Sequence, residues 1–446
     1  MTATARDQTP AGPLGSRFAA AAFGGYALLG RLATPLVRRH LRQRLARGKE
    51  EAGRLGERLG QAGVARPPGP LIWIHGASVG EAQSALPLIE RLRRDWPGFA
   101  ILVTSGTVTS AKLMATRLPA GVIHQYVPVD LPSAVTAFLD HWQPQIGLIV
   151  ESEFWPNLLR GAAARGTRLV LLNGRVSADS YRGWRRARPL IAELLGCFSL
   201  ITARAPEDRD HLLALGAGQV ASPGDLKAAA PPLTADPAEL ARLQEAVKSR
   251  ALWLAASTHA GEERIAGETH RALKARIPGL LTLLAPRHPS RARAIRRELE
   301  ALGLKVACRS QGDPIVADTD VYLADTIGEL GLWLRLAEIV FVGGSLVAHG
   351  GQNLLEPAKL DCAILAGPHT ANFARLAAEM TAAGALRAVG GPAALTAAVA
   401  DLQAQPAERQ ALAAAARRYA EAQAGVLERV MEALAPLLRE SSDSAV

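Results

Sequence analysis

The sequence predicts an α/β protein made of two Rossmann-like, doubly wound domains. Short apolar strands alternate with amphipathic helices, the pattern stops at a stretch rich in Pro and Ala and then starts again, and most strands end in polar or Gly-rich residues. A chain of 446 residues also exceeds one ordinary core, since a domain averages roughly 150 residues. The strands lack polar alternation, which is typical of parallel sheets covered on both faces.

The first 65 residues differ from the rest. Residues 1–16 contain Pro, Gly, Thr and Gln without periodicity, so we expect a disordered leader. Within residues 17–65, an apolar run of 13 residues (18–30) precedes a basic helix, and a bilayer span needs about 20 residues. We expect this segment to lie on a membrane or to cross it once, because the apolar and basic blocks adjoin. The alternative is an apolar helix packed on the protein.

Charge and cysteine content limit the possible functions. The chain has 51 Lys and Arg against 41 Asp and Glu, and this net charge of +10 indicates anionic partners such as phosphates, acidic lipids or nucleic acid. Aromatic residues make up 4%, which disfavours nucleic acid because single-strand binders need stacking platforms. The three cysteines are far apart and no HExxH motif occurs, so we expect a reduced, cytosolic compartment and no metal site.

The first globular domain is expected over residues 66–227. Its strand at 71–74 leads into His75 and then Glu81, and open α/β sheets bind ligands beyond the carboxyl ends of their strands. Glu81 is therefore a candidate site residue. Ser78 and Glu81 also fit a capping box at the start of the helix 81–94, and the two roles are compatible. The other expected strands are 101–105, 124–128, 146–150, 169–173 and 200–203.

Two acids follow the buried strand 146–150. Glu151 and Glu153 are two residues apart, so their side chains point to opposite faces if the strand continues, and at most one faces a ligand. Capping of the helix that begins near Pro156 would account for only one of them. Lys227 stands just before the hinge expected within 222–237 and is a lone positive charge that could reach the same site.

The second domain is expected over residues 228–446 and should face the first across a cleft. Its C-terminal helix, 406–438, either closes this domain or crosses back to the first. The stretch 342–356 has Gly pairs after a strand and before a helix, which suits a phosphate, although Gly pairs also serve ordinary turns. It lacks the GxGxxG spacing, so a nicotinamide dehydrogenase is disfavoured. The expected strands are 253–256, 280–285, 321–324, 339–342 and 363–366.

Three side chains of this domain suit a ligand that carries phosphate or carboxylate oxygens and sugar hydroxyls. Arg287 and His288 follow the strand 280–285, and a guanidinium fork matches phosphate or carboxylate oxygens. A solvated turn is the alternative there, because arginine is abundant nearby. Glu356, one turn into the helix after the Gly pairs, is placed to accept hydrogen bonds from sugar hydroxyls.

Eight motifs in colinear order resemble those of the Kdo transferases, glycosyltransferases of GT-B type that act in lipopolysaccharide inner-core synthesis (Kdo is 3-deoxy-D-manno-oct-2-ulosonic acid). The resemblance runs from about residue 18 to the C-terminal helices. The motifs are HGASVGE (75–81), ESEFWPNLL (151–159), NGRVSADSY (173–181), GDLK (224–227), STHAGEE (257–263), PRHP (286–289), DTIGEL (325–330) and VGGSLVAHGGQNLLEPA (342–358).

The resemblance implies transfer of Kdo from CMP-Kdo to a lipid A precursor of lipid IVA type, at the cytoplasmic face of the inner membrane, with no resident cofactor or metal. It implies that Glu81 is the proton acceptor and that Glu151 and Lys227 support the transition state. Asp225 stands where the family usually has Asn or Ser, which makes the role of Lys227 the least secure. The implied CMP-binding residues are Arg287, His288, Ile327, Gly328, Glu329, Asn353, Leu354, Leu355 and Glu356.

Two alternatives stay open at this point. One is another GT-B glycosyltransferase that uses a different nucleotide sugar, for example an enzyme similar to a lipid A disaccharide synthase. The other is a membrane-peripheral protein that binds anionic lipid without catalysis, which only the basic N-terminal helix favours.

Overall fold

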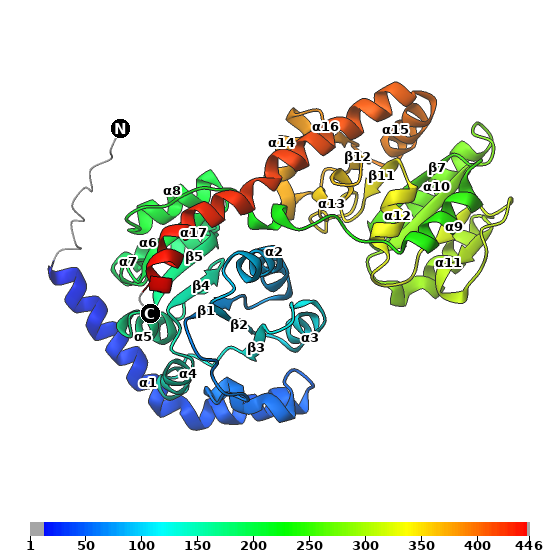
Figure 1. The fold of residues 1–446 in the computed structure, drawn as a ribbon. Helices are drawn as coiled ribbons and strands as arrows, with labels where there is room; N and C mark the ends of the chain where they lie inside the picture. Colours follow the sequence, from blue (N-terminus) through cyan, green and yellow to red (C-terminus); the bar gives the residue numbers. More distant parts are fainter. Residues whose placement is uncertain (1–12, 444–446) are drawn as a thin grey trace. The chain divides into compact units, whose positions relative to one another are not determined.

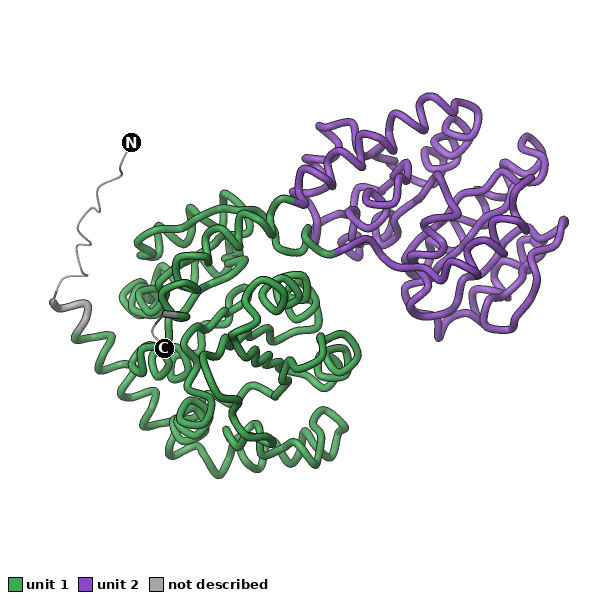
Figure 2. Tube along the Cα trace, in the orientation of Figure 1, with its two compact units in different colours: residues 1–230, 425–446 green, residues 231–424 purple. Residues whose placement is uncertain are grey.

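The computed structural model describes residues 13–443, and the chain forms two compact units (Figure 2). The first unit comprises Met1–Ala230 and Gly425–Val446, and the second comprises Pro231–Ala424. The crossing from Ala230 to Pro231 falls within the expected hinge. In each unit, helices cover both faces of a parallel sheet (Figure 1), so the prediction of two Rossmann-like domains is confirmed.

The first unit begins with a long helix and then alternates strands with helices. Its elements are α1 (Pro13–Ala46), η1 (Ala52–Leu59), β1 (Leu71–His75), α2 (Val79–Asp95), β2 (Ala100–Ser105), α3 (Val108–Arg117), β3 (Ile123–Tyr126), α4 (Pro132–Trp142), β4 (Ile146–Val150), α5 (Pro156–Ala164), β5 (Arg168–Gly174), α6 (Ala178–Arg186), α7 (Arg188–Leu195), β6 (Phe198–Ala203), α8 (Pro206–Leu215), η2 (Leu226–Ala229) and α17 (Val426–Asp443).

The first sheet has the order β3-β2-β1-β4-β5-β6, and every pairing between these strands is parallel. Strand order reverses between β1 and β4, the point where open α/β sheets bind ligands. In β1, Ile72 and Ile74 pack with α2 and α17, whereas Leu71 and Trp73 pack with α4 and α5. Burial on both faces explains why the strand sequence shows no polar alternation.

The N-terminal helix α1 packs on the first unit along one side only. Ala19 and Phe23 are buried against Ile191 and Leu194 of α7, whereas the leucines on the other side are exposed. By length and composition, Arg17–Ala46 could cross a membrane, and 6% of its most apolar 18-residue stretch is buried. The helix is compatible with membrane association. The expected leader, 1–16, lies outside the described residues except for 13–16, which begin α1.

The segment after α1 is integrated into the first unit. Arg58 of η1 is buried, donates a hydrogen bond to the Val127 carbonyl at 3.2 Å and pairs with Glu50 at 3.0 Å. Glu57 accepts a hydrogen bond from the Tyr126 backbone N–H at 2.7 Å. The expected division, in which residues 17–65 formed a segment of their own, therefore differs from the structure. Buried polar groups need hydrogen-bond partners, and Glu57 and Arg58 find theirs at the end of β3.

The second unit repeats the alternation of strands and helices. Its elements are α9 (Pro237–Val247), β7 (Leu252–Thr258), α10 (Glu262–Lys274), β8 (Leu281–Pro286), η3 (Pro289–Arg291), α11 (Ala292–Ala301), β9 (Val306–Cys308), η4 (Arg309–Gln311), β10 (Val321–Leu323), α12 (Leu330–Leu336), β11 (Ile339–Val342), α13 (Leu355–Ala358), β12 (Ala363–Ala366), η5 (Ala371–Phe373), α14 (Ala374–Ala382), β13 (Arg387–Ala388), α15 (Pro392–Ala404) and α16 (Pro406–Ala424).

The second sheet has the order β13-β12-β11-β7-β8-β10-β9, also parallel, with its switch point between β7 and β11. The short strands β9 and β13 extend it beyond the expected five. The C-terminal stretch is two helices, and the second, α17, packs on the first sheet through residues such as Val430 and Leu434. The chain therefore crosses back, and the expected assignment of residues 425–446 to the second domain differs from the structure.

Candidate active site

The loop after β1 places Glu81 at the switch point of the first sheet. The structure forms the capping box that the sequence allows: the Ser78 hydroxyl accepts the Glu81 N–H at 3.3 Å, and the Glu81 carboxylate accepts the Ser78 N–H at 3.4 Å. The same carboxylate accepts hydrogen bonds from the Ala77 N–H at 2.8 Å and the Ser78 hydroxyl at 2.7 Å. The turn fixes Glu81, which stays only partly buried.

Glu151 comes to the same end of the sheet, because β1 and β4 pair with His75 opposite Ile149. Its backbone has φ of +63°, a left-handed conformation that is uncommon outside glycine and is concentrated at functional sites. Glu151 accepts a hydrogen bond from the Lys227 ammonium at 2.6 Å, and its side chain is 12% exposed. The structure therefore brings Lys227 to Glu151, whereas the residues alone indicated only a lone positive charge that could reach the site.

Lys227 is held by a short hydrogen-bonded link to β5. The Asn173 side chain donates to Asp225 at 3.2 Å and accepts the Leu226 N–H at 2.9 Å. Asp225 in turn accepts the Lys227 N–H at 2.9 Å. Asp225, where the family usually has Asn or Ser, thus still caps the turn that carries the lysine. Sequence analysis gave no role to Asn173, and a polar residue at the end of a buried strand was the available signal.

Glu153 completes an acidic cluster with Glu81 and Glu151. Burial raises the pKa of Glu153, the hydrogen bond from Trp155 opposes the rise, and the negative charges of Glu81 and Glu151 add to it. His75 lies beneath, 1% exposed, with its Nε2 atom 4.0 Å from the Glu153 carboxylate. The acidic cluster, with Lys227 at its side, is suited to accepting a proton and to stabilising a positively charged centre.

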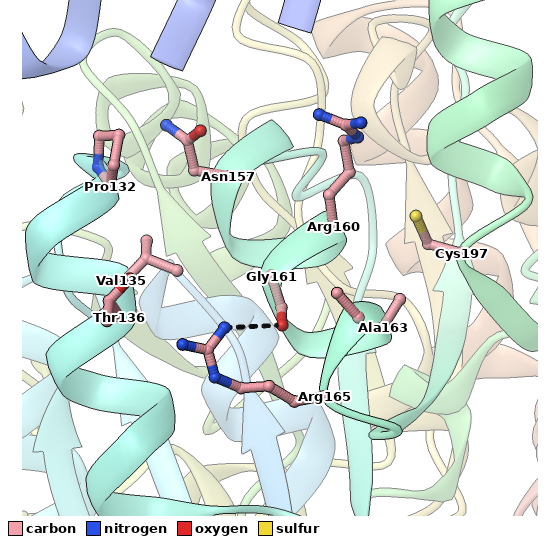
Figure 3. Close-up of a pocket in the computed structure, with 10 residues that line it drawn as sticks. Pro132, Val135, Thr136, Asn157, Arg160, Gly161, Ala163, Arg165 and Cys197 are labelled. Carbon is pink, nitrogen blue, oxygen red and sulfur yellow. Dashed lines mark hydrogen bonds between the residues drawn. The ribbon is translucent and has the colours of Figure 1, made fainter. Parts of the chain in front are cut away.

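A cavity of about 410 Å³ lies between α4 and α5 (Figure 3), and no residue of the acidic cluster lines it. Arg160 pairs with Glu193 at 3.1 Å and lies over the Phe23 ring of α1, and Arg165 pairs with Asp140 at 2.8 Å. The two arginines that line the cavity are therefore already paired. The residues that line it are Pro132, Val135, Thr136, Asn157, Arg160, Gly161, Ala163, Ala164, Arg165 and Cys197, none of them a predicted site residue.

In the second unit, the loop after β11 lies against the loop after β7. A Cβ atom on Gly343 would stand 2.7 Å from the Ser257 carbonyl oxygen, so this approach requires glycine. The buried Glu262 accepts backbone N–H groups from Gly344 at 2.6 Å, Ser345 at 3.0 Å and Leu346 at 2.9 Å, and from His259 at 2.9 Å. Sequence analysis missed this role, although Glu262 follows His259 at the spacing of a helix cap.

Arg287 and His288 follow β8 and reach the same end of the second sheet. The Arg287 N–H donates to the Thr258 carbonyl at 3.0 Å, which ties this turn to the end of β7. The His288 ring stands edge-on to His259 at 5.7 Å, and the His259 ring lies 3.7 Å from that of His349. Burial, and then the charge of His349, lower the pKa of His259. Imidazole and guanidinium groups thus converge here, which suits an anion.

The other predicted nucleotide-binding residues lie in the loop after β10 and around the start of α13. Ile327 is 88% exposed, and Glu329 pairs with Arg309 at 2.6 Å. Leu354 and Leu355 are buried, so a ligand could reach only their backbone. Burial raises the pKa of Glu356, and hydrogen bonding from Asn353 opposes the rise. The helix after the Gly pairs, α13, is a single turn, so its dipole is weaker than the sequence suggested.

Comparison with known proteins identifies the family. A sequence profile described as 3-deoxy-D-manno-octulosonic-acid transferase (kdotransferase) matches residues 53–230. The chain is 37% identical over 395 residues to the 3-deoxy-D-manno-octulosonic acid transferase of Bordetella pertussis, covering 84% of this chain and 90% of that one. This chain belongs to the Kdo transferase family. The corresponding transferase of Haemophilus influenzae is 34% identical over 397 residues, covering 87% and 92%.

Solved structures agree on the fold of this Kdo transferase. UDP-GlcNAc 2-epimerase from Neisseria meningitidis, in a crystal structure bound to UDP-GlcNAc, superposes with a TM-score of 0.58 at 13% sequence identity, covering 82% of this chain and 100% of that one. At this identity the likeness concerns the fold alone, which is of GT-B type. Because the family profile and the curated relatives are 3-deoxy-D-manno-octulosonic acid transferases, the protein is an enzyme, a glycosyltransferase. Among residues 13–443, no group of three His, Cys, Asp or Glu residues is arranged to hold a metal ion.

Proposed function

We propose that this transferase moves Kdo from CMP-Kdo to a lipid A precursor of lipid IVA type. In this proposal Glu81 accepts the proton of the attacking hydroxyl, and Glu151 and Lys227 support the transition state. The observation that carries the proposal is the acidic cluster at the switch point of the first sheet, where Lys227 is 2.6 Å from Glu151. The proposed CMP-binding residues are Arg287, His288, Ile327, Gly328, Glu329, Asn353, Leu354, Leu355 and Glu356.

The chemistry requires a base and a means of stabilising the leaving group. A sugar hydroxyl is a poor nucleophile, so a carboxylate that accepts its proton as the new bond forms contributes on the order of 10²- to 10⁴-fold. The acceptor oxygen bonds to the anomeric carbon of Kdo, the bond from that carbon to the CMP phosphate breaks, and the proton passes to Glu81. The Arg287 guanidinium stabilises the negative charge that develops on the departing phosphate. We expect transfer to continue in the presence of EDTA.

The acceptor and the membrane are the other partners that we propose. A lipid A precursor is anionic and amphipathic, and the exposed side of α1 offers an apolar surface beside basic residues at its C-terminal end. Each basic residue near an anionic surface contributes about 1 kcal/mol. We therefore place the enzyme at the cytoplasmic face of the inner membrane. Among the described side chains of α1, the exposed large hydrophobic ones are Phe18, Tyr26, Leu28, Leu29, Leu32 and Leu36.

The decisive experiment incubates the purified full chain with CMP-Kdo and a tetraacylated lipid A precursor, and weighs the lipid products by mass spectrometry. We expect a mass increase of one or more Kdo residues and release of CMP. UDP-sugars in place of CMP-Kdo test the alternative donor. Transfer from a UDP-sugar but not from CMP-Kdo would overturn the donor assignment, and binding of the lipid without any transfer would overturn the catalytic assignment.

A further inference from the structure

A cavity of about 280 Å³ opens beside the acidic cluster and has no role in the mechanism above. We call it the β4–β5 pocket, because its walls come from the loops that follow β4 and β5 and from α6. It shares Glu153 with the acidic cluster, so a ligand bound there would lie next to the proposed reaction centre. The lining residues are Ser152, Glu153, Phe154, Trp155, Arg175, Val176, Ser180 and Trp184.

The pocket has the side chains of a carbohydrate site. Trp155 is 44% exposed, and the Trp184 ring stands edge-on to Phe154 at 6.4 Å. Partly exposed aromatic rings offer a flat apolar face to a ligand, and a few polar groups then fix its orientation. One Glu153 oxygen accepts the Trp155 indole N–H at 2.5 Å, and its other oxygen has no hydrogen-bond partner among residues 13–443. That oxygen is free to accept a sugar hydroxyl.

Arg175 gives the pocket a preference for anions. Among the described residues its guanidinium has no ion pair and no hydrogen bond, whereas the Ser152 hydroxyl bonds to its backbone carbonyl and so fixes the loop. A guanidinium fork binds phosphate or carboxylate oxygens through two parallel hydrogen bonds. The N-terminus of α6 follows directly, capped by Ser177, and its dipole favours negative charge in the same place.

We propose that the β4–β5 pocket binds an anionic sugar residue of the acceptor. Trp155 and Trp184 contact the ring, Arg175 binds its phosphate or carboxylate, and Glu153 accepts one of its hydroxyls. The volume suits a single ring, since pockets for larger drug-sized ligands begin at about 300 Å³. This inference rests on the proposed function, because it names the part of the acceptor that the first unit recognises.

Steady-state kinetics with CMP-Kdo and a bisphosphorylated lipid A precursor test the pocket. We expect Arg175→Ala to raise the acceptor KM about 10- to 100-fold, the cost of losing a charged hydrogen bond, and to leave the donor KM within about twofold. The acceptor KM of Arg175→Lys should lie between those of the wild type and Arg175→Ala, because lysine keeps the positive charge but lacks the two parallel donors of the guanidinium. The matched control is Arg186→Ala, an exposed arginine at the other end of α6 that should change neither KM.

The acceptor itself distinguishes the two sources of negative charge. With a precursor that lacks one phosphate, the penalty of Arg175→Ala should vanish if that phosphate occupies the pocket. If the ligand is the carboxylate of a Kdo residue already transferred, the penalty should appear only with an acceptor that carries Kdo. An acceptor KM unchanged by both Arg175→Ala and Trp155→Ala, with all three acceptors, would overturn the proposal.

A binding measurement separates failure of the pocket from failure of the proposed function. Calorimetric titration with the deacylated, bisphosphorylated disaccharide needs no turnover. Binding to the wild type that weakens at least tenfold in Arg175→Ala supports the pocket even if Kdo is not transferred. Equal binding by the two proteins, both of this disaccharide and of one that carries a Kdo residue, overturns it even if transfer is observed. Trp155→Phe, which keeps a ring but loses the indole N–H, provides a milder variant that should weaken binding less than Trp155→Ala.

Discussion

Each of the two Rossmann-like units carries an acid in the turn after its first strand, and the two acids are held differently. Glu81 follows β1, remains partly exposed, and within the described part of the chain accepts hydrogen bonds only from Ala77 and Ser78 of its own turn. Glu262 follows β7, is 1% exposed, and accepts one N–H from its own turn and three from the loop after β11. One position in the fold therefore supports two different roles.

The difference lies in where the hydrogen-bond donors come from. A carboxylate that accepts hydrogen bonds from the loop after a neighbouring strand joins two loops and is excluded from water. Its role is therefore to hold the loops of the site in place. A carboxylate held by its own turn is fixed yet reachable, which a general base requires. The two sheet edges differ accordingly: acids and one lysine gather in the first unit, and arginine, imidazoles and glycines gather in the second.

The largest effect is expected for the acid of the first unit. Glu81→Gln keeps an oxygen for the Ala77 N–H but cannot accept a proton, so kcat should fall about 10²- to 10⁴-fold. CMP affinity, measured by calorimetry, should not change. Near-wild-type turnover would remove Glu81 from the base role.

Ser78→Ala provides the matched control for Glu81→Gln. It removes the capping hydroxyl and keeps the carboxylate, so the helix should lose about 1 kcal/mol of stability while most of the activity survives. Equal losses of activity in the two variants would mean that the capping box, and not proton transfer, explains the effect of Glu81→Gln.

The next largest effect concerns stability against acid. The pKa of His75 is lowered to about 4, chiefly by burial; the hydrogen bond with the Thr104 carbonyl opposes the shift, and the Arg58 charge adds to it. Between pH 4 and the ordinary value of 6.5, the unfolded chain binds a proton that the folded chain does not. The stabilisation is therefore fully present above pH 6.5 and is lost as the pH falls to 4, and it amounts to roughly 3 kcal/mol.

Urea unfolding followed by circular dichroism at pH 4.5 and 7.5 measures this loss. His75→Gln should reduce the loss by about half, because the pKa of His124, also in the first unit, is likewise lowered to about 4 by burial and the Arg54 charge. In the second unit His270 lies 3.3 Å from Asp320, whose charge opposes the effect of burial. An unchanged pH dependence in His75→Gln would show that this buried imidazole is not the acid-sensitive group.

The sequence predicted the elements that depend on local pattern. Apolar runs ending in polar residues located the strands that precede Glu81, Glu151 and Arg287, and the spacing of Ser78 and Glu81 predicted the capping box. These features could be found because each depends on residues adjacent in the chain. The membrane role of α1 and the CMP-binding residues stay predictions.

Long-range contacts could not be predicted in the same way. Glu262 contacts loop residues some 80 positions later, and Asn173 contacts Asp225, which also lies far along the chain. No sequence periodicity indicates either contact. The helix α17 is amphipathic whichever sheet it covers, and only the packing of Val430 and Leu434 on the first sheet decides its place. The short strand β13 has two residues, too few to show a pattern.

The acid of the second unit should affect donor binding and not the proton transfer. Glu262→Gln replaces two acceptor oxygens with one, so up to two of the loop N–H groups lose their partner, at a cost of about 2 kcal/mol in stability. CMP affinity should fall about tenfold as the loop loosens, with the acceptor KM unchanged. Glu268→Gln, a surface acid of the same helix, is the control. Calorimetry showing unaltered CMP binding would contradict this assignment.

The smallest effect is expected for the residue that holds Lys227. Asn173→Gly retains the backbone conformation, with φ of +55°, and removes the side chain that links Asp225 and Leu226. We expect kcat to fall about five- to tenfold, equivalent to about 1 kcal/mol, with both KM values unchanged. Because Asn173 acts through the lysine, the double variant with Lys227→Ala should be no slower than Lys227→Ala alone. Additive losses would mean that Asn173 contributes to catalysis by a separate route.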